Sequence, residues 1–404
     1  MNTVIVGGGA AGMMSAYYSA LSGDRVVLLE RNEKLGKKLY ITGKGRCNLT
    51  NDCDLDEFFR NVVTNPKFLF GCVRSFTPVD VMELFESFGL KLKVERGNRV
   101  FPLSDKSSDV IKALTRALEK QRVTVRTGAR VTKIAAENGR VIGVYVGGEF
   151  IACDKAIVCT GGASYPLTGS TGDGYRLAKE CGHEIVPVRP ALCGLLLKGD
   201  FTGLAGLSLK NVGYKAVNGE KTVYKDFGEL LFTHKGISGP VVLSSSSYIS
   251  AAGEGDFKAI IDLKPALDEK TLDRRLLRDF ALYNNKSLKN ALCDLLPRSL
   301  IGEVIRAAGL DAESSVSVLT AENRKKLLYT LKNLTYDVTG LMPLDEAIVT
   351  GGGVSVKQIN PKTMESKIVK GLYFAGEVID VDALTGGFNL QCAFSTAHAA
   401  GTAE

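Results

Sequence analysis

A glycine-rich segment near the start of the chain carries the clearest chemical pattern. Gly7, Gly9 and Gly12 have the spacing G-x-G-x-x-G, between the apolar run 3–6 and the alanine-rich stretch 10–21. A strand followed by such a turn and a helix lets the backbone approach a pyrophosphate, whose charge the helix N-terminus stabilises. The glycines in this setting predict a dinucleotide-binding turn.

A second strand and an acidic residue complete the predicted unit. The apolar segment 25–29 ends at Glu30, which follows Gly12 by 18 residues. Dinucleotide-binding units place at about this distance the carboxylate that bonds a ribose hydroxyl. We therefore expect Glu30 to bind a ribose of the dinucleotide.

Two later segments indicate which dinucleotide is bound. Segments 156–162 and 371–377 each read as a strand that runs into glycine. Together they resemble the later nucleotide-facing segments of glutathione-reductase-like flavoproteins, which favours FAD. No second strand-GxGxxG-helix unit occurs, so a nicotinamide cofactor would visit the flavin transiently rather than occupy its own domain.

Several specific strings extend this resemblance to the whole chain. They are Gly36–Asn51, Arg99–Pro102, Thr160–Gly174, Phe232–Pro240, Gly351–Val354 and Phe374–Gln391. In order and content they resemble the HI0933-like, or BaiN-like, family of bacterial FAD-dependent oxidoreductases, from Val4 to about Gly401. The resemblance implies an α/β fold with a Rossmann-type FAD-binding domain of the glutathione-reductase-like kind, interrupted by inserts. No histidine or cysteine lies in a context that suggests a covalent flavin link, so we expect FAD held without a covalent bond.

The dinucleotide pattern and the resemblance together give a set of candidate FAD-binding residues. The set is Gly7, Gly9, Ala11, Gly12, Glu30, Arg31, Lys38, Gly45, Arg46, Asn48, Val131, Thr160, Gly161, Gly376, Glu377, Gly386, Gly387, Asn389 and Leu390. Gly386 and Gly387 open what reads as the last helix. Its N-terminus would stabilise the negative charge that builds on the flavin ring during reduction.

Some of these positions have plainer readings. The loop that holds Lys38 and Arg46 is alternatively a solvated basic loop. Val131 resembles the position whose backbone meets adenine, but it also suits an ordinary core strand. In the same loop we interpret Cys47 as a packed thiol rather than a redox centre, because it lacks a resolving partner.

The pattern along the chain predicts three regions. Residues 1–190 alternate strand-like and helical stretches, and residues 335–404 return to that pattern, which gives a discontinuous FAD-binding domain. Residues 191–265 read as short strands with glycine turns, a β-rich insert on the substrate side. Residues 266–334 are charged and helical, so we expect a second, helical insert.

Catalytic and metal-binding residues give weaker signals. His234 is the candidate catalytic residue, since a histidine can donate a proton near neutral pH. The alternative is a structural histidine with satisfied hydrogen bonds. Arg99 is a candidate for orienting an acidic or carbonyl substrate. Only three histidines occur, and their spacing does not suit a metal, so no metal site is expected.

Composition and charge limit the class of protein. The chain has 51 basic and 44 acidic residues, dispersed rather than massed, so we expect a small-molecule substrate rather than nucleic acid. No apolar run approaches the roughly 18 residues of a membrane span, and no signal peptide precedes the first strand. A cytoplasmic enzyme is expected.

The resemblance implies hydride transfer between a small organic substrate and FAD. The first expectation is reduction of a conjugated C=C bond in a 3-oxo steroid, such as a bile-acid intermediate, with NAD(P)H or another donor. One alternative is oxidation of an amine such as aminoacetone, with O₂ as acceptor and release of H₂O₂. An alternative of another class is a flavin-containing protein that binds RNA or modifies tRNA, which the formal charge of +7 motivates.

Overall fold

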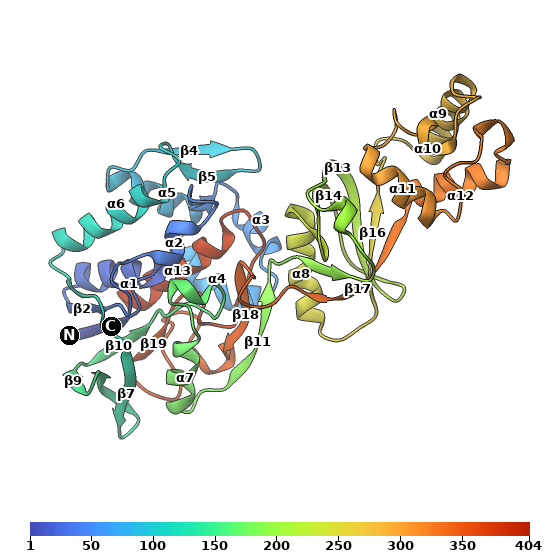
Figure 1. Cartoon of the computed structure of the whole chain (residues 1–404). Coiled ribbons are helices and arrows are strands. Elements are labelled where there is room, and N and C mark those ends of the chain that lie inside the picture. Colours follow the sequence, from blue (N-terminus) through green and yellow to red (C-terminus); the bar gives the residue numbers. More distant parts are fainter. The chain divides into compact units, whose positions relative to one another are not determined.

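The computed structural model describes residues 1–404, which form two compact units (Figure 1). Unit 1 comprises Met1–Ala191 and Pro343–Glu404, and unit 2 comprises Leu192–Met342. Buried apolar side chains form one cluster in unit 1 and another in unit 2. Each unit therefore has a hydrophobic core of its own.

A parallel five-stranded sheet forms the centre of unit 1, in the order β19-β10-β1-β2-β6. Its strands are β1 (Asn2–Val6), β2 (Arg25–Leu29), β6 (Thr124–Arg126), β10 (Lys155–Val158) and β19 (Leu372–Phe374). Val6 of β1 pairs with Leu29 on one side and with Val158 on the other. The carboxyl ends of these strands therefore meet at one edge, where open α/β sheets bind ligands.

Two helices of unit 1 pack closely against each other. They are α1 (Ala10–Leu21) and α13 (Phe388–Thr402). The hydroxyls of Ser15 and Ser19 donate to backbone carbonyls of α13 over 3.3 and 3.4 Å. A Cβ on Gly401 would lie 2.8 Å from the Cβ of Tyr18. Small residues at this interface thus bring the first and last helices of the chain together.

The remaining α-helices of unit 1 number six, and its remaining strands form three small sheets. The helices are α2 (Lys37–Ile41), α3 (Leu55–Arg60), α4 (Phe70–Ser75), α5 (Pro78–Ser87), α6 (Ser107–Lys120) and α7 (Asp173–Glu180). Three small sheets contain β3 (Thr50–Asn51), β5 (Arg99–Pro102) and β4 (Leu92–Glu95); β7 (Val131–Glu137), β8 (Arg140–Val146) and β9 (Glu149–Ala152); and β11 (Ile185–Ala191) and β18 (Val349–Val354). No helix of the protein is both long and apolar enough to span a bilayer.

Helix α5 begins with a capping box. The Thr77 hydroxyl accepts from the Asp80 amide over 3.3 Å, and the Asp80 carboxylate accepts from the Thr77 amide over 2.7 Å. We expect Thr77→Ala to lower the free energy of unfolding by about 1 kcal/mol, because the Asp80 amide loses its acceptor and the Asp80 carboxylate loses the Thr77 hydroxyl as a donor. Urea unfolding measures the change. Ser87→Ala, in the last turn of α5, is the matched control, and an equal loss in both variants would contradict the prediction.

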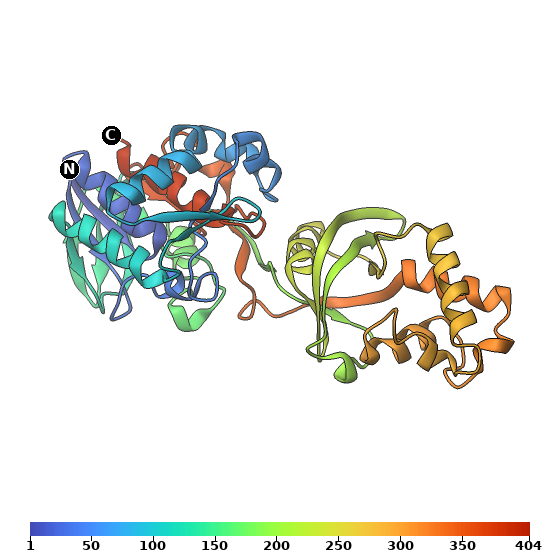
Figure 2. The same cartoon turned by 90° about the horizontal axis from the view of Figure 1, so that it is seen from above.

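A closed six-stranded barrel forms one part of unit 2, in the order β12-β15-β14-β13-β16-β17. The strands are β12 (Leu195–Leu197), β13 (Ser208–Asn218), β14 (Lys221–Thr233), β15 (Gly236–Ser238), β16 (Phe257–Asp262) and β17 (Leu334–Leu341). A group of helices lies at one end of the barrel (Figure 2). They are α9 (Glu269–Leu282), α10 (Leu288–Ala291), α11 (Arg298–Ala307) and α12 (Ala321–Lys332).

The segment predicted to be β-rich also contains a helix, α8 (Pro240–Ala252). It includes four consecutive buried serines, residues 244–247. The hydroxyls of Ser246 and Ser247 accept from the Cys193 and Leu192 amides over 2.9 and 3.2 Å. Serine is a poor helix former in isolation, so this helix depends on tertiary partners that local sequence does not reveal.

The observed division of the chain differs from the predicted one in two places. Residues 335–341 belong to the barrel strand β17, although we assigned them to the returning FAD domain. The barrel and the helices α9–α12 form one unit rather than two inserts, because Leu272, Leu300 and Tyr336 share one buried cluster. A shared core is a long-range property that a change of local pattern does not report.

Candidate flavin-binding site

The turn between β1 and α1 is shaped by three glycines. Gly7 has φ +104°, and its amide donates to the Leu29 carbonyl over 2.8 Å. A Cβ on Gly12 would overlap the Gly7 carbonyl, whereas a Cβ on Gly9 would meet no protein atom within 4 Å. No side chain caps α1, so the amides of its first turn stay available. The turn therefore offers space and N–H groups to a pyrophosphate.

Glu30 is held against this turn at the end of β2. Its side chain is buried, and one carboxylate oxygen accepts from the Gly8 amide over 2.6 Å. The other oxygen accepts from the amide and the side chain of Asn32, both over 2.7 Å. The Ala129 amide donates to the Glu30 carbonyl, which brings the start of β7 and Val131 alongside. We did not predict Asn32, although its position two residues after the acid is a local signal.

We expect Glu30→Gln to weaken FAD binding by about 10-fold, because a carboxamide presents a donor to one of the amides that Glu30 now accepts from. Titration of deflavinated protein with FAD, followed by flavin fluorescence, measures the dissociation constant. Glu33→Gln removes a nearby exposed carboxylate and is the control. Equal FAD affinities in the two variants would show that Glu30 does not contribute to FAD binding.

Two further predicted segments reach the same edge of the sheet. Gly376 follows β19 with φ +78°, and its missing Cβ would lie 2.8 Å from the Cβ of Ala11 on α1. Thr160 and Gly161 follow β10, which lies between β1 and β19. The Thr160 hydroxyl is buried and has no hydrogen-bond partner in the protein. Such a group is costly unless a ligand pairs with it.

Lys38 and Glu377 form an ion pair at this edge. The Lys38 ammonium lies 2.7 Å from a Glu377 oxygen, and it donates to the Ser164 hydroxyl over 2.7 Å. The Thr350 amide donates to Glu377 over 2.9 Å. The two residues, 339 positions apart in sequence, thus lie side by side in the structure. Ser164 and Thr350, which complete the network, were missed.

The start of α13 is fixed by neighbouring side chains. The Asn51 side chain donates to the Gly386 carbonyl over 2.9 Å. Gly387, the N-cap, has φ +100°, and a Cβ there would overlap the Thr50 carbonyl. The Asn389 side chain accepts from the Ala383 amide over 3.0 Å and donates to the Ala383 carbonyl over 2.7 Å. Asn389 therefore shapes the preceding loop through its own side chain.

Leu390 follows in the first turn of α13. It is partly buried and packs against the core of unit 1. No side chain caps the helix at Gly387, so its first amides stay available to a ligand. The backbone rather than the side chains of this turn is suited to a flavin ring.

The basic loop after α2 divides into two groups. The Arg46 guanidinium donates to Glu95 and Asp105 over 2.5 Å each and lies 4.2 Å from the centre of the Phe101 ring. The structure thus joins Arg46 to the β4–β5 hairpin rather than to the glycine turn. Gly45 has φ +84° and open space at its Cβ position. The buried Asn48 oxygen has no partner and is free to pair with a ligand.

Cys47 and Arg31 are engaged by the protein itself. Burial raises the pKa of Cys47 to about 12, which keeps it a protonated thiol at neutral pH. The Arg31 guanidinium lies 3.1 Å from Asp173 and donates to the Thr171 hydroxyl. A cofactor role for Arg31 stays a prediction.

His234 lies in unit 2, in the exposed turn between β14 and β15. No protein group bonds its ring. Its candidate catalytic role stays a prediction, since the residues above all belong to unit 1.

A buried acidic cluster follows Glu377 and was not predicted. Burial raises the pKa of both Asp380 and Asp382. Asp382 lies 3.5 Å from the Arg189 guanidinium on β11, and the Asn65 side chain donates to Asp380 over 3.0 Å. These groups fix the chain between Glu377 and Gly386. The D-V-D triplet in this segment was the available signal.

The buried polar atoms provide a test of whether FAD fits. The Thr160 hydroxyl, just after β10, and the Asn48 oxygen, in the loop between α2 and β3, are buried and lack partners in the protein. The position at Gly9 adds open space in front of the uncapped first turn of α1. The residues present therefore suit FAD. The fold and site define a Rossmann-type FAD-binding protein, which confirms the predicted fold class.

The chain belongs to the HI0933-like family. Residues 1–403 match the family model described as "HI0933-like protein Rossmann domain". The chain is 33% identical over 411 residues to the "3-dehydro-bile acid delta(4,6)-reductase" of Clostridium scindens, covering 100% of this chain and 99% of the relative. It is 33% identical over 403 residues to the "Ribosomal RNA dihydrouridine synthase" of Escherichia coli, covering 98% and 96%.

A solved structure supports the fold. The 3-ketosteroid delta1-dehydrogenase of Sterolibacterium denitrificans matches with a TM-score of 0.52 and 13% identity, covering 99% of this chain and 98% of that one. At this identity the match supports the fold alone. Family membership and the nucleotide site together make this chain an FAD-dependent oxidoreductase.

Proposed function

We propose that the protein reduces a C=C bond conjugated to a carbonyl group, with NAD(P)H as the electron donor. One observation carries the proposal: two relatives that match almost the full chain have names that describe such reductions. In a 4-en-3-one the double bond is conjugated to the 3-oxo group, and in uridine the C5=C6 bond is conjugated to the C4 carbonyl. The shared reaction is addition of a hydride to the β-carbon and a proton to the α-carbon.

The chain's residues have distinct roles in this proposal. Gly7, Gly9 and Gly12 admit the pyrophosphate, and Glu30 bonds the ribose. The first amides of α13 stabilise negative charge on the bound ring. When bound, FAD in its reduced form would supply the hydride, and NAD(P)H would restore that reduced form. Per double bond the overall reaction consumes one NAD(P)H and one proton and yields NAD(P)⁺.

For the substrate we favour a 3-oxo steroid of the bile-acid type. The support is the first relative, whose match covers 100% of this chain and 99% of the relative. The second candidate is uridine in RNA, which the E. coli relative and the formal charge of +7 favour. Both candidate substrates need the same reduced cofactor. The two are therefore distinguished by which compound reoxidises the flavin.

Anaerobic reoxidation of the flavin tests the proposal. Purified protein is reduced with NADPH or NADH, and the absorbance near 450 nm is followed after addition of a 4-en-3-oxo bile acid or of ribosomal RNA. We expect the enone to restore the absorbance and to become saturated at C4–C5. If ribosomal RNA reoxidises the flavin and the enone does not, the substrate is uridine in RNA rather than a steroid. Reduction by aminoacetone, followed by reoxidation only in air with release of H₂O₂, would make the protein an amine oxidase.

A further inference from the structure

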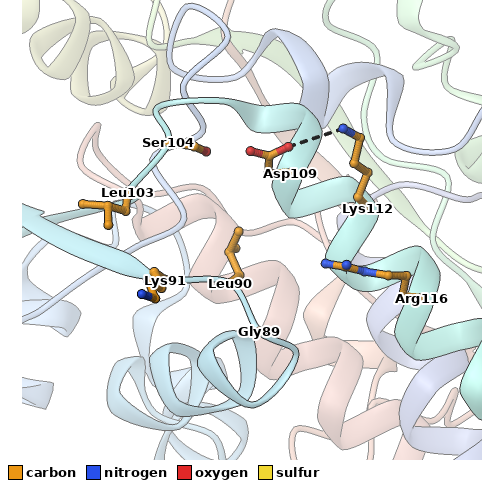
Figure 3. Close-up of a pocket in the computed structure, with 8 residues that line it drawn as sticks. All are labelled: Gly89, Leu90, Lys91, Leu103, Ser104, Asp109, Lys112 and Arg116. Atoms are coloured by element: carbon orange, nitrogen blue, oxygen red, sulfur yellow. Dashed lines mark ion pairs between the residues drawn. The ribbon is translucent and has the colours of Figure 1, made fainter.

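Unit 1 contains an open cleft that the nucleotide site does not use (Figure 3). It has a volume of about 480 Å³ and lies where the loop after α5 meets the base of the β4–β5 hairpin and helix α6. Its lining residues are Gly89, Leu90, Lys91, Leu103, Ser104, Asp109, Lys112 and Arg116. A volume of this size suits part of a small molecule.

The cleft has an excess of positive charge. Lys91, Lys112 and Arg116 contribute three cations, and Asp109 contributes the one carboxylate. Asp109 pairs with Lys112 over 3.5 Å, whereas neither Lys91 nor Arg116 has a partner in the protein. Figure 3 shows Arg116 extending from α6 toward Leu90. Two unpaired cations in a concave site are suited to an anionic group.

The β4–β5 hairpin connects this cleft to the start of α13. At the cleft end the Leu103 amide donates to the Lys91 carbonyl over 2.8 Å. At the other end the Asn51 side chain donates to the carbonyls of both Gly97, in the hairpin turn, and Gly386. Four-residue strands such as these span about 13 Å. The cleft is therefore about one strand length from the Gly386 loop.

We propose that the cleft binds the 2′-phosphate end of NADPH, with Arg116, Lys112 and Lys91 as phosphate ligands. The inference rests on the proposed function, in which a nicotinamide dinucleotide donates the hydride. In an extended dinucleotide the phosphorylated ribose lies well away from the nicotinamide. The cleft and the Gly386 loop are about one strand length apart, so one dinucleotide can reach both. Exposed Leu103 adds apolar surface for the adenine base. A single concave cleft suits one terminal phosphate better than a run of RNA phosphates, which binds along extended basic surfaces.

Binding of NADP⁺ and NAD⁺ to the FAD-loaded protein tests the assignment without turnover. Isothermal titration calorimetry is carried out on wild type, Arg116→Gln and the triple variant Lys91→Gln/Lys112→Gln/Arg116→Gln. We expect Arg116→Gln to weaken NADP⁺ binding about 10-fold and the triple variant about 100-fold, with NAD⁺ affinity unchanged. Lys120→Gln, which removes an exposed charge one turn further along α6, is the matched control and should change neither affinity.

Each outcome decides the assignment. Equal NADP⁺ affinities in all variants, or no NADP⁺ binding by wild type, would overturn it. Loss of RNA retention in the triple variant with NADP⁺ binding intact would assign the cleft to RNA phosphates instead. If NADP⁺ binding depends on Arg116 but no conjugated C=C bond is reduced, the cleft assignment stands and the proposed reaction fails.

Discussion

Gly9→Val is expected to fold like the wild-type protein and to lose its FAD. Gly9 has φ −81° and ψ −165°, an extended conformation that valine adopts readily, and a Cβ there meets no protein atom within 4 Å. The added side chain therefore enters only the space assigned to the pyrophosphate. We expect the affinity for FAD to fall by at least about 100-fold, about 2.7 kcal/mol.

Two measurements separate the ligand effect from folding. Thermal unfolding of the deflavinated variant should match that of deflavinated wild type, while titration with FAD should show the lost affinity. Gly302→Ala, at an open helical position in unit 2, is the control for adding a side chain without consequence for FAD. A variant that purifies with full flavin content would place the pyrophosphate elsewhere.

The choice of Gly9 follows from the packing around the other glycines. A side chain at Gly12 overlaps the Gly7 carbonyl, and one at Gly387 overlaps the Thr50 carbonyl. Substitution at either position disturbs the backbone before any ligand binds, so loss of flavin there would not identify a contact. All three glycines are candidate FAD-binding residues by sequence, and of the three only Gly9 has open space at its Cβ position.

The parts of the site that depend on local order could be predicted from sequence. A strand, a glycine turn and a helix follow one another within residues 2–21, and β2 with Glu30 comes next. The parallel register then aligns the strand ends by geometry. The fold class follows from the same local units, which explains why it is confirmed.

The parts that depend on distant partners could not be predicted. Arg46 looks like any basic loop residue until its ion pairs with Glu95 and Asp105, 49 and 59 positions away, are seen. The serine-rich helix α8 is a weak helix by propensity and forms because its hydroxyls meet the chain at Leu192 and Cys193. Side-chain pairing across such separations has no periodic signature.

A buried lysine gives the second large prediction. Lys155 on β10 is 1% exposed, and its ammonium donates to the carbonyls of Gly401 and Ala403 over 3.3 and 2.6 Å. It also lies 4.8 Å from the centre of the Tyr373 ring. Burial lowers the pKa of Lys155 to about 8, because the charged form loses hydration. It joins the central sheet to the end of α13.

Because its pKa is lowered in the folded protein, Lys155 makes the free energy of unfolding increase with pH. Between about pH 8 and 10.5 the unfolded chain keeps the Lys155 proton that the folded chain has released, so the unfolded state binds more protons. The free energy of unfolding should therefore increase by about 3 kcal/mol across this interval from Lys155 alone. Buried tyrosines titrate in the opposite sense at high pH, so the absolute curve does not isolate the lysine.

The difference between wild type and Lys155→Met isolates it. Both proteins carry the same tyrosines and buried cysteines, and the contributions of those distant from position 155 cancel when the unfolding free energies are subtracted at each pH. We expect wild type to gain about 3 kcal/mol on the variant between pH 7 and 10.5, in urea unfolding followed by flavin fluorescence. Lys120→Met, an exposed lysine, should give a flat difference. A flat difference for Lys155→Met as well would mean that this ammonium is hydrated, and that the end of α13 is held without it.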